Sequence, residues 1–370
     1  MEDKKIVDEQ ALENKCPSCK ASIKFNPKVG KFKCEYCGSE FTLEEMQKHS
    51  DNASTEEKNK KKEEQKVEPD NFDQYVSYKC ESCGAEIVAD DQTAATFCVY
   101  CGNTAILKSK LSGKFTPDMI IPFKQDSEAP KTAFKGLSKG RPLMPKDFNS
   151  EKNIEKIKGV YIPFWLYDLN VSGDLNMKGE IITSWSVGDT HYTKTDTYNV
   201  IRGGNMDYNK IPVDASSRFD NDIMNSIEPF NFNELIPYNH AYLSGFFAEK
   251  YDEEGETVLK EASDRALNST RDKLKNDASR YTTKVVTGDS LTVKEKNKAY
   301  AMLPVYMVNV KYNDKMHIFA MNGQTGEFIG NIPLDKKKTV IYFIGIFIVT
   351  FILVIIGSLI LFVLGGNLWK

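Results

Sequence analysis

Eight cysteines, all within the first 101 residues, place the strongest constraint on how this chain of 370 residues can fold. They form two copies of the pattern C-x2-C-x14-C-x2-C, and the second copy lies 64 residues after the first. The members are Cys16, Cys19, Cys34 and Cys37 in the first copy, and Cys80, Cys83, Cys98 and Cys101 in the second. Two C-x2-C knuckles bring four thiolates around one metal ion, so each copy predicts a zinc ribbon with these cysteines as ligands.

The four-thiolate pattern also predicts the role of the metal. Four thiolates complete a tetrahedral Zn²⁺ site and leave no position for water or a substrate, so we expect two structural Zn²⁺ sites that stabilise small modules. Gly38, Gly84 and Gly102 follow the second cysteine of three knuckles and permit a turn with positive φ, whereas Lys20 takes that position in the first knuckle. The same ligands could hold rubredoxin-like iron or take part in thiol–disulfide exchange, and the pattern leaves these alternatives open.

A long apolar segment lies near the C-terminus. Residues 340–364, VIYFIGIFIVTFILVIIGSLILFVL, include no charged side chain. As a helix they would extend roughly 37 Å, enough to cross a hydrocarbon core of ~30 Å with some tilt. Three lysines, 336–338, precede the segment and only Lys370 follows it, which predicts cytoplasmic N-terminal domains. We therefore expect a tail-anchored, single-pass protein of the cell membrane, whose cysteines lie in a reducing compartment that favours metal binding over disulfides.

Changes in composition and hydrophobic pattern along the chain predict a multidomain α+β protein with two small N-terminal zinc ribbons, a strand-rich mixed domain and one C-terminal transmembrane helix. The expected divisions are zinc ribbon 1 at 14–48, a charged flexible linker at 49–70, zinc ribbon 2 at 71–108, a strand-rich α+β cytosolic domain at 109–335, and the transmembrane helix at 340–364. The linker has almost no apolar side chain to bury, which is typical of a solvated tether.

Several segments of the third domain have a recognisable periodicity. YIPFWLYD, 161–168, is apolar on both faces of an extended chain and predicts a central buried strand. HYTKTDTYNVI, 191–201, is rich in Thr and Tyr and predicts a second strand. Apolar residues at helical spacing predict a helix at 254–280, and alternation around Asn313 predicts a hairpin at 304–321. The glycines of RGGN, 202–205, and of GQTG, 323–326, are interpreted as turn residues.

The charge distribution bears on nucleic-acid binding. The net charge of the chain is −3, residues 1–48 contain nine Lys and nine acidic residues, and residues 71–108 contain two Lys and five acidic residues. A ribbon that grips phosphates should gather Lys and Arg on one face, so the second ribbon in particular does not fit this role. A basic and helical segment at 131–141 could contact nucleic acid or anionic lipid headgroups, or could form a solvated helix face.

Catalytic motifs are not evident in the sequence. The four histidines, His49, His191, His240 and His317, are scattered, and none lies in HExxH or beside a cysteine. No G-x-x-x-x-G-K-[ST] loop is present, and GLSKGRPLMPK, 136–146, does not match one. We therefore expect a protein that is not an enzyme and has no small-molecule substrate. An enzyme whose site in the strand-rich domain follows no familiar motif is the weaker alternative.

A set of motifs in the order of the chain gives a family resemblance. After the paired ribbons come PDMIIPFK (117–124), GVYIPFWLYD (159–168), IPVDASSRFDN (211–221), IEPFNFNELIPY (227–238), YLSGFFAEKY (242–251) and NGQTGEFIG (322–330). Together they resemble the bacterial membrane-anchored proteins with two transcription-factor-IIB-type zinc ribbons, a family often labelled primosomal-helicase-like. That family is similar to the membrane-bound partners of phage-shock-type envelope-stress systems, and the resemblance implies recruitment of soluble proteins to the bilayer.

These observations together predict a non-catalytic, tail-anchored zinc-ribbon adaptor that recruits protein partners to the cytosolic face of the membrane. The family carries over only the eight cysteines as functional residues, since it supplies no catalytic group. The alternative is a membrane-tethered zinc-ribbon protein that binds nucleic acid or regulates transcription.

Overall fold

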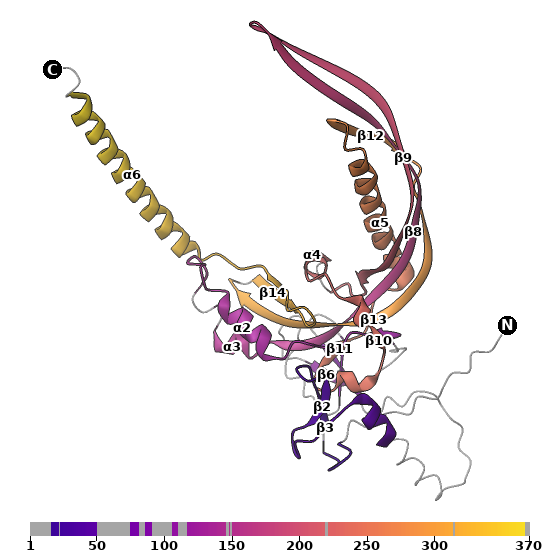
Figure 1. Cartoon of the computed structure of the whole chain (residues 1–370). Helices are drawn as coiled ribbons and strands as arrows, with labels where there is room; N and C mark the ends of the chain where they lie inside the picture. The colour runs from indigo at the N-terminus through magenta and orange to yellow at the C-terminus, as the bar shows by residue number, and fades with distance from the viewer. Residues whose placement is uncertain are drawn as a thin grey trace, which may run out of the picture.

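A computed structural model describes residues 16–21, 23–49, 75–80, 86–90, 106–109, 117–145, 148, 150–218, 221–313 and 315–366 (Figure 1). They form a mixed α+β body that carries two projections, a long curved β-sheet arm and a C-terminal helix. The cysteine-rich N-terminal part packs at the opposite end of the body from these projections. The predicted linker, apart from His49, lies outside the described residues.

The N-terminal part is a small three-stranded antiparallel sheet with the order β1-β2-β3. Its strands are β1 (Ile23–Asn26), β2 (Lys31–Cys34) and β3 (Glu40–Phe41), and a helical segment at 43–49 follows them. Alternation along β1 and β2 buries Ile23, Phe25 and Phe32 on one face, while the lysines between them stay exposed.

The other strands belong to one sheet of twelve strands, whose main path is β10-β7-β13-β8-β11-β5-β4-β6. The short members are β4 (Tyr75–Cys80), β5 (Glu86–Asp90), β6 (Ile106–Ser109), β7 (Met119–Ile120), β10 (Ile236–Pro237), β11 (Phe247–Glu249), β12 (Thr283–Asp289), β14 (Lys315–Asn322) and β15 (Phe328–Gly330). Strand β5 pairs antiparallel with β11. The strands of the predicted second ribbon therefore continue the sheet of the strand-rich part.

The arm is built from three unusually long strands, β8 (Lys158–Val187), β9 (Thr190–Asp214) and β13 (Thr292–Tyr312). Strands β8 and β9 form an antiparallel hairpin that pairs from Phe164–Asp214 out to the Val187–Thr190 turn. On its other side β8 pairs first with β13 and farther out with β12. The outer end of the hairpin has no further strand beside it, and Figure 1 shows it as the tip of the arm.

One helix, α5 (Gly255–Asp277), covers the inner face of the arm (Figure 1). Its buried side is lined by small residues, including Ala262 and Ala266, which let it lie close to Tyr167 and Leu169 of β8. Leu274, about two turns beyond Ala266, packs against Leu175 and Met177. The helix therefore stiffens a sheet that would otherwise have both faces in water.

The body has an aromatic core next to the N-terminal sheet. Phe123 and Phe246 stack with ring centroids 4.1 Å apart, and Tyr161 and Tyr306 contact Phe123 at 5.0 and 4.8 Å. The Tyr306 hydroxyl donates a hydrogen bond to the Gln125 carbonyl at 2.9 Å, so its polar tip is satisfied although the ring is buried.

Smaller helices complete the body at its edges. They are α2 (Glu128–Gly136), α3 (Glu151–Ile154), α4 (Asn221–Ser226), η1 (Phe232–Glu234) and η2 (His240–Leu243). The last helix, α6 (Lys336–Gly366), leaves the body and contains the predicted span at 340–364. Its most apolar window has a mean hydropathy of 3.0 and none of it is buried, so the helix is long and apolar enough to cross a membrane.

The local predictions for the strand-rich part are largely confirmed. Residues 161–168 lie in the centre of the sheet, the helix predicted at 254–280 is α5, and the predicted hairpin is β13–β14 with Asn313 at φ +48. The glycines of 323–326 do form a turn.

The interpretation of RGGN as a turn is wrong, because residues 202–205 lie inside β9. A Cβ at Gly203 would collide with the Asp174 carboxylate on β8, and a Cβ at Gly204 would meet Leu274 of α5. Gly203 therefore permits close packing within a strand, and neither glycine reverses the chain.

Candidate metal centre

The four cysteines of the first copy come together at one end of the N-terminal sheet. Cys16, Cys19, Cys34 and Cys37 place their sulfur atoms within 4.8 Å of one another. Cys16 Sγ and Cys37 Sγ are 3.6 Å apart, and Cys19 Sγ and Cys34 Sγ are 3.5 Å apart. These distances are too long for a disulfide bond, which is ~2.05 Å.

The sulfur geometry fits a tetrahedral metal ion. Zn–S bonds of ~2.3 Å place neighbouring sulfur atoms of a regular tetrahedron roughly 3.8 Å apart, close to the separations found here. Thiolates are soft ligands that suit zinc or iron. The group can therefore hold one metal ion and, with four protein ligands, would leave no coordination position for water or a substrate.

Two turns of the same shape present the thiols. The Lys20 N–H donates to the Cys16 carbonyl at 2.8 Å, and the Gly38 N–H donates to the Cys34 carbonyl at 2.9 Å. Both donors have positive φ, +63 for Lys20 and +74 for Gly38. The first knuckle thus adopts the glycine conformation with a lysine, which costs about 1 kcal/mol or more in backbone strain.

The environment of Cys37 favours its thiolate form. Hydrogen bonding with Ser39 lowers the pKa of the Cys37 thiol to about 6. The Ser39 side chain has the larger effect and its backbone N–H the smaller one. This one ligand, Cys37, therefore binds a metal ion with little competition from protons, whereas desolvation and the neighbouring thiols raise the pKa of Cys19 to about 12.

The N-terminal sheet is docked on the body through aromatic rings and an ion pair. Phe25 and Phe32 contact Tyr242 of η2 with ring centroids 5.0 and 5.6 Å apart. Lys28 forms an ion pair with Asp126 of the body, which lowers the pKa of that carboxyl. The sheet that carries the thiol cluster is therefore attached to the body by the same aromatic side chains that form the core of the sheet.

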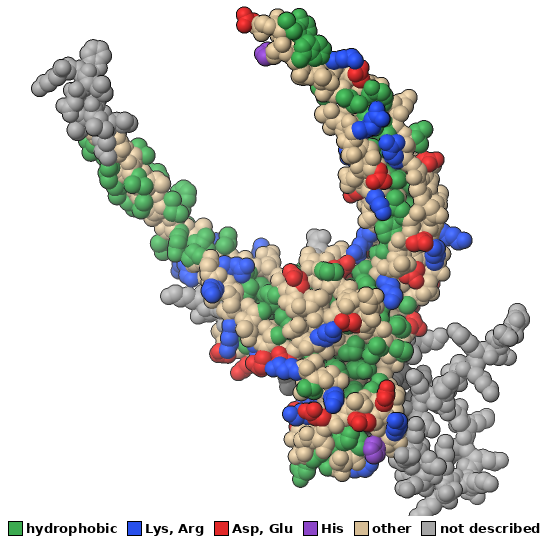
Figure 2. Space-filling model, in the orientation of Figure 1, with side chains coloured by type: hydrophobic (Ala, Val, Ile, Leu, Met, Phe, Trp, Pro, Cys, Tyr) green, Lys and Arg blue, Asp and Glu red, His purple; other side chains and the backbone are tan. Residues whose placement is uncertain are grey.

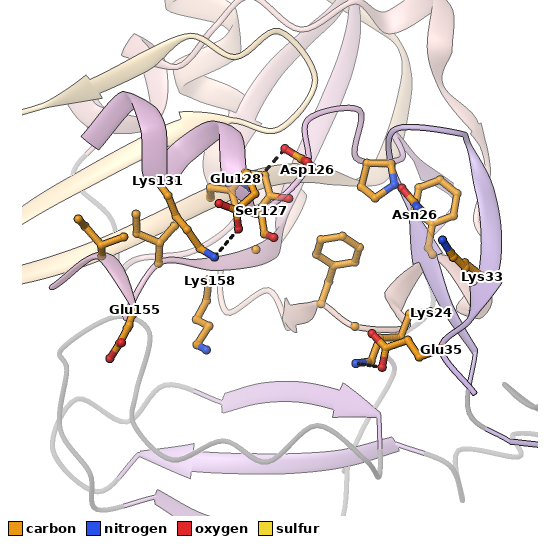
Figure 3. Close-up of a pocket in the computed structure, with 18 of the residues that line it drawn as sticks. Lys24, Asn26, Lys33, Glu35, Asp126, Ser127, Glu128, Lys131, Glu155 and Lys158 are labelled. Atoms are coloured by element: carbon orange, nitrogen blue, oxygen red, sulfur yellow. Dashed lines mark hydrogen bonds and ion pairs between the residues drawn. The ribbon is translucent and has the colours of Figure 1, made fainter. Parts of the chain in front are cut away.

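A groove of about 810 Å³ runs between the N-terminal sheet and the body (Figure 3). Phe246 and Tyr306 supply its apolar wall. The described residues that line it include five lysines and five carboxylates: Lys24, Lys33, Lys131, Lys135 and Lys158, with Glu35, Asp126, Glu128, Glu151 and Glu155. Figure 3 shows two of the ion pairs, Lys24 with Glu35 and Lys131 with Glu128. The groove is thus balanced in charge, which suits a protein surface better than a polyanion.

The second cysteine copy is only partly within the described residues. Cys80 ends β4 and is fully buried. Cys83, Cys98 and Cys101 lie outside the described residues, so the second predicted site stays a prediction.

The histidines whose side chains the structure describes, His49, His191 and His317, do not join the thiol cluster. His191 Nδ1 lies 2.6 Å from the Ser186 hydroxyl on the arm, and His317 Nδ1 lies 3.0 Å from the Asn331 carbonyl. Within the part of the chain that the structure describes, the thiol cluster is the group of metal-ligating side chains whose ligand atoms converge.

A buried acidic junction at the base of the arm was not predicted from the sequence. Glu249 is fully buried and accepts hydrogen bonds from the Ser216 hydroxyl and the Arg218 guanidinium, both at 2.9 Å. Arg218 also pairs with Asp252 at 3.1 Å. Burial raises the pKa of nearby Asp214 to about 7. The two halves of the junction lie more than 30 residues apart in the sequence, so only the fold reveals it.

The chain is 33% identical, over 341 aligned residues, to a Bacillus subtilis (strain 168) protein named "Uncharacterized protein YdjG". The aligned region covers 79% of this chain and 99% of YdjG. This chain belongs to the YdjG family. Because nearly all of YdjG aligns, the relationship to YdjG cannot be confined to one cysteine-rich module. No protein-family model matches the chain, and no solved structure matches it.

Proposed function

We propose that this protein is a membrane-anchored zinc-ribbon adaptor. In this proposal α6 crosses the cell membrane once, the rest of the chain faces the cytoplasm, and the eight cysteines hold two structural Zn²⁺ ions. The protein carries out no reaction of its own and recruits other proteins to the membrane surface.

The proposal rests on one observation: the same chain carries four converging thiols, which could enclose a metal ion, and an exposed apolar helix. Four converging thiols would fill the coordination sphere of a metal ion, which supports a structural role for that ion. The apolar window of α6 is not buried in the protein, and a bilayer would cover it. The three lysines at 336–338 support the cytoplasmic placement of the body.

The groove supports a protein partner. It offers an apolar wall at Phe246 and Tyr306 between charges of both signs, a composition typical of the surfaces where proteins meet. The resemblance to envelope-stress proteins gives the proposed context, in which the recruited partner belongs to a phage-shock-type response.

The decisive experiment is affinity capture from membranes solubilised in detergent. The wild type is compared with Cys34→Ser and Cys98→Ser, one for each cysteine copy, and metal content is measured on each preparation. We expect specific proteins with the wild type and their loss from at least one variant. Tyr36→Ala serves as the control, because Tyr36 is 84% exposed at the knuckle and its removal should leave the metal bound.

Identical captured proteins in equal amounts from the wild type and both cysteine variants would exclude the ribbons as the recruiting surface. Fractionation of cell membranes tests the proposed membrane anchoring separately. The full chain should remain in the membrane after alkaline carbonate washing, and a chain that ends at residue 335 should not.

The nucleic-acid alternative has its own measurement. It requires salt-sensitive binding of DNA or RNA by the full chain in detergent, with a steep dependence of log affinity on log salt concentration. The charge balance of the groove argues against this alternative.

A further inference from the structure

The basic segment after α2 is attached to the first turn of α6. The Asp335 N–H donates to the Leu143 carbonyl at 2.9 Å, and the Lys338 ammonium donates to the Met144 carbonyl at 2.6 Å. These contacts connect residues almost 200 positions apart and fix the 137–145 turn beside the start of the apolar helix.

Four basic side chains lie on the two segments that these contacts join, and we call them the basic collar: Lys139, Arg141, Lys336 and Lys337. All four are exposed, and none forms an ion pair with a carboxylate among the described residues. The nearby Lys131 and Lys135, in contrast, pair with Glu128 and Glu151. Figure 2 shows Lys and Arg side chains where the apolar helix meets the body.

Among the described residues no carboxylate pairs with the collar, and the sequence around it is poor in acidic residues. No Asp or Glu occurs from residue 129 to 146, and none occurs after Asp335. Asp335 itself is engaged at the helix start, where its Oδ1 accepts the N–H groups of Lys337 and Lys338 at 2.9 and 3.2 Å. It acts as an N-terminal cap through backbone N–H groups, so it does not occupy the ammonium groups of Lys336 and Lys337.

We propose that the basic collar binds the headgroups of anionic phospholipids in the membrane that α6 crosses. This inference rests on the proposed membrane anchoring. The uncharged part of α6 begins at Thr339, so Lys336 and Lys337 lie at the level where hydrocarbon gives way to headgroups. The contacts at Leu143 and Met144 hold Lys139 and Arg141 close to the same level.

The position of the collar favours lipid over nucleic acid. A polynucleotide at this site would have to enter between the body and the bilayer, where anionic headgroups repel it. Lipid phosphates are already present there at high local concentration. Arg141 can bind a phosphate through two N–H groups, while the lysines act as point charges.

The test uses the full chain reconstituted into phosphatidylcholine bilayers that contain a trace of spin-labelled lipid. The motionally restricted fraction of the spectrum reports lipid in contact with the protein. The ratio of association constants for spin-labelled phosphatidylglycerol and phosphatidylcholine is measured for the wild type and for the double variant Lys139→Gln/Arg141→Gln. The matched control is Lys260→Gln/Lys273→Gln, which removes two exposed lysines from α5.

We expect the wild type and the control to prefer phosphatidylglycerol. In the collar variant this preference should fall roughly fivefold for each side chain that contacts a phosphate. It should also fall at ~1 M salt, where the screening length is about 3 Å. A collar variant with the preference of the wild type would overturn the inference.

The other outcomes separate the inference from the anchoring on which it rests. A restricted component with equal association of both lipids would support membrane anchoring by α6 and would overturn headgroup binding by the collar. No restricted component for either lipid would overturn both. A labelled single-stranded oligonucleotide is added to the same samples. Binding that the collar variant loses, without a phosphatidylglycerol preference in the wild type, would assign the collar to nucleic acid.

Discussion

The acidic junction at the base of the arm makes a sharp prediction about pH. Asp214 ends β9 and is 7% exposed, and its carboxylate accepts the Ser216 N–H. Burial is the main cause that raises its pKa from 3.8 to about 7, and the charges of Glu249 and Glu253 add to the rise. The folded protein therefore keeps Asp214 protonated over a pH range in which the unfolded chain ionises it.

The magnitude follows from the separation of the two pKa values. At about 1.4 kcal/mol for each pH unit, the separation corresponds to on the order of 4 kcal/mol. The full contribution is present below about pH 4, it declines as the pH rises, and it is lost once the pH passes about 7. Replacement of Asp214 by Asn removes the ionisable group, so the free energy of unfolding should no longer decline over this range from this cause.

The assay is denaturant unfolding of the full chain in detergent between pH 5 and 8, followed by tryptophan fluorescence. Trp165 reports on the junction, because its indole N–H donates to the Glu253 carbonyl at 2.9 Å. Relative to Asp214→Asn, the wild type should lose about 1.4 kcal/mol per pH unit from pH 5 to 6.5. The comparison cancels the pH dependence of the thiol cluster, which both proteins share.

Asp264→Asn, an exposed position on α5, provides the matched control and should leave the slope of the wild type unchanged. If Asp214→Asn and the wild type show parallel curves across this range, Asp214 is already ionised in the folded protein and the argument fails.

Three further predictions concern the metal, the arm and the base of the arm. Elemental analysis should find two metal ions per wild-type chain and about one in Cys34→Ser. Gly173→Ala should lower the thermal stability more than Gly188→Ala. Both glycines have positive φ, but only a Cβ at position 173 would meet a backbone carbonyl, that of Ser290. The cost of Gly173→Ala should be roughly 1–3 kcal/mol. Arg265→Met should cost about 1–3 kcal/mol in chemical unfolding, because the Arg265 guanidinium holds the half-buried Glu228 carboxylate at 2.9 and 3.0 Å.

The sequence predicts those features that arise from local periodicity. The alternation of 161–168 and the helical spacing of 254–280 depend on neighbouring residues, and both segments adopt the expected structure. The convergence of Cys16 and Cys37 was likewise predictable, because ligand spacing in a ribbon follows from the chemistry of the metal.

Other features depend on residues that only the fold brings together. The length of β8 could not be predicted, because its outer half is polar on one face and depends on pairing with β9 and β12 and on packing against α5. Gly203 resembles a turn residue until its register with Asp174 is known. Ser216 and Glu249, in the acidic junction, belong to two separate motifs, 211–221 and 242–251, and nothing in the sequence shows that these two side chains meet. Packing at long range decides each of these cases, and a single sequence contains little information about it.

Docking of the N-terminal sheet connects the thiol cluster to the groove. The sheet forms one wall of the groove, and Phe25 and Phe32 attach it to Tyr242. Loss of the metal should loosen the sheet and open that wall, so a partner in the groove would respond to the metal content of the thiol cluster.

This connection can be tested without touching a thiol. Tyr242→Ala removes the ring that holds Phe25 and Phe32, where aromatic contacts contribute about 0.5–1.5 kcal/mol each. The variant should retain its metal and yet capture less of the partner, whereas Tyr192→Ala, at the arm, should behave as the wild type. Full capture by Tyr242→Ala would mean that the partner binds elsewhere, because the altered wall would then have no effect on binding.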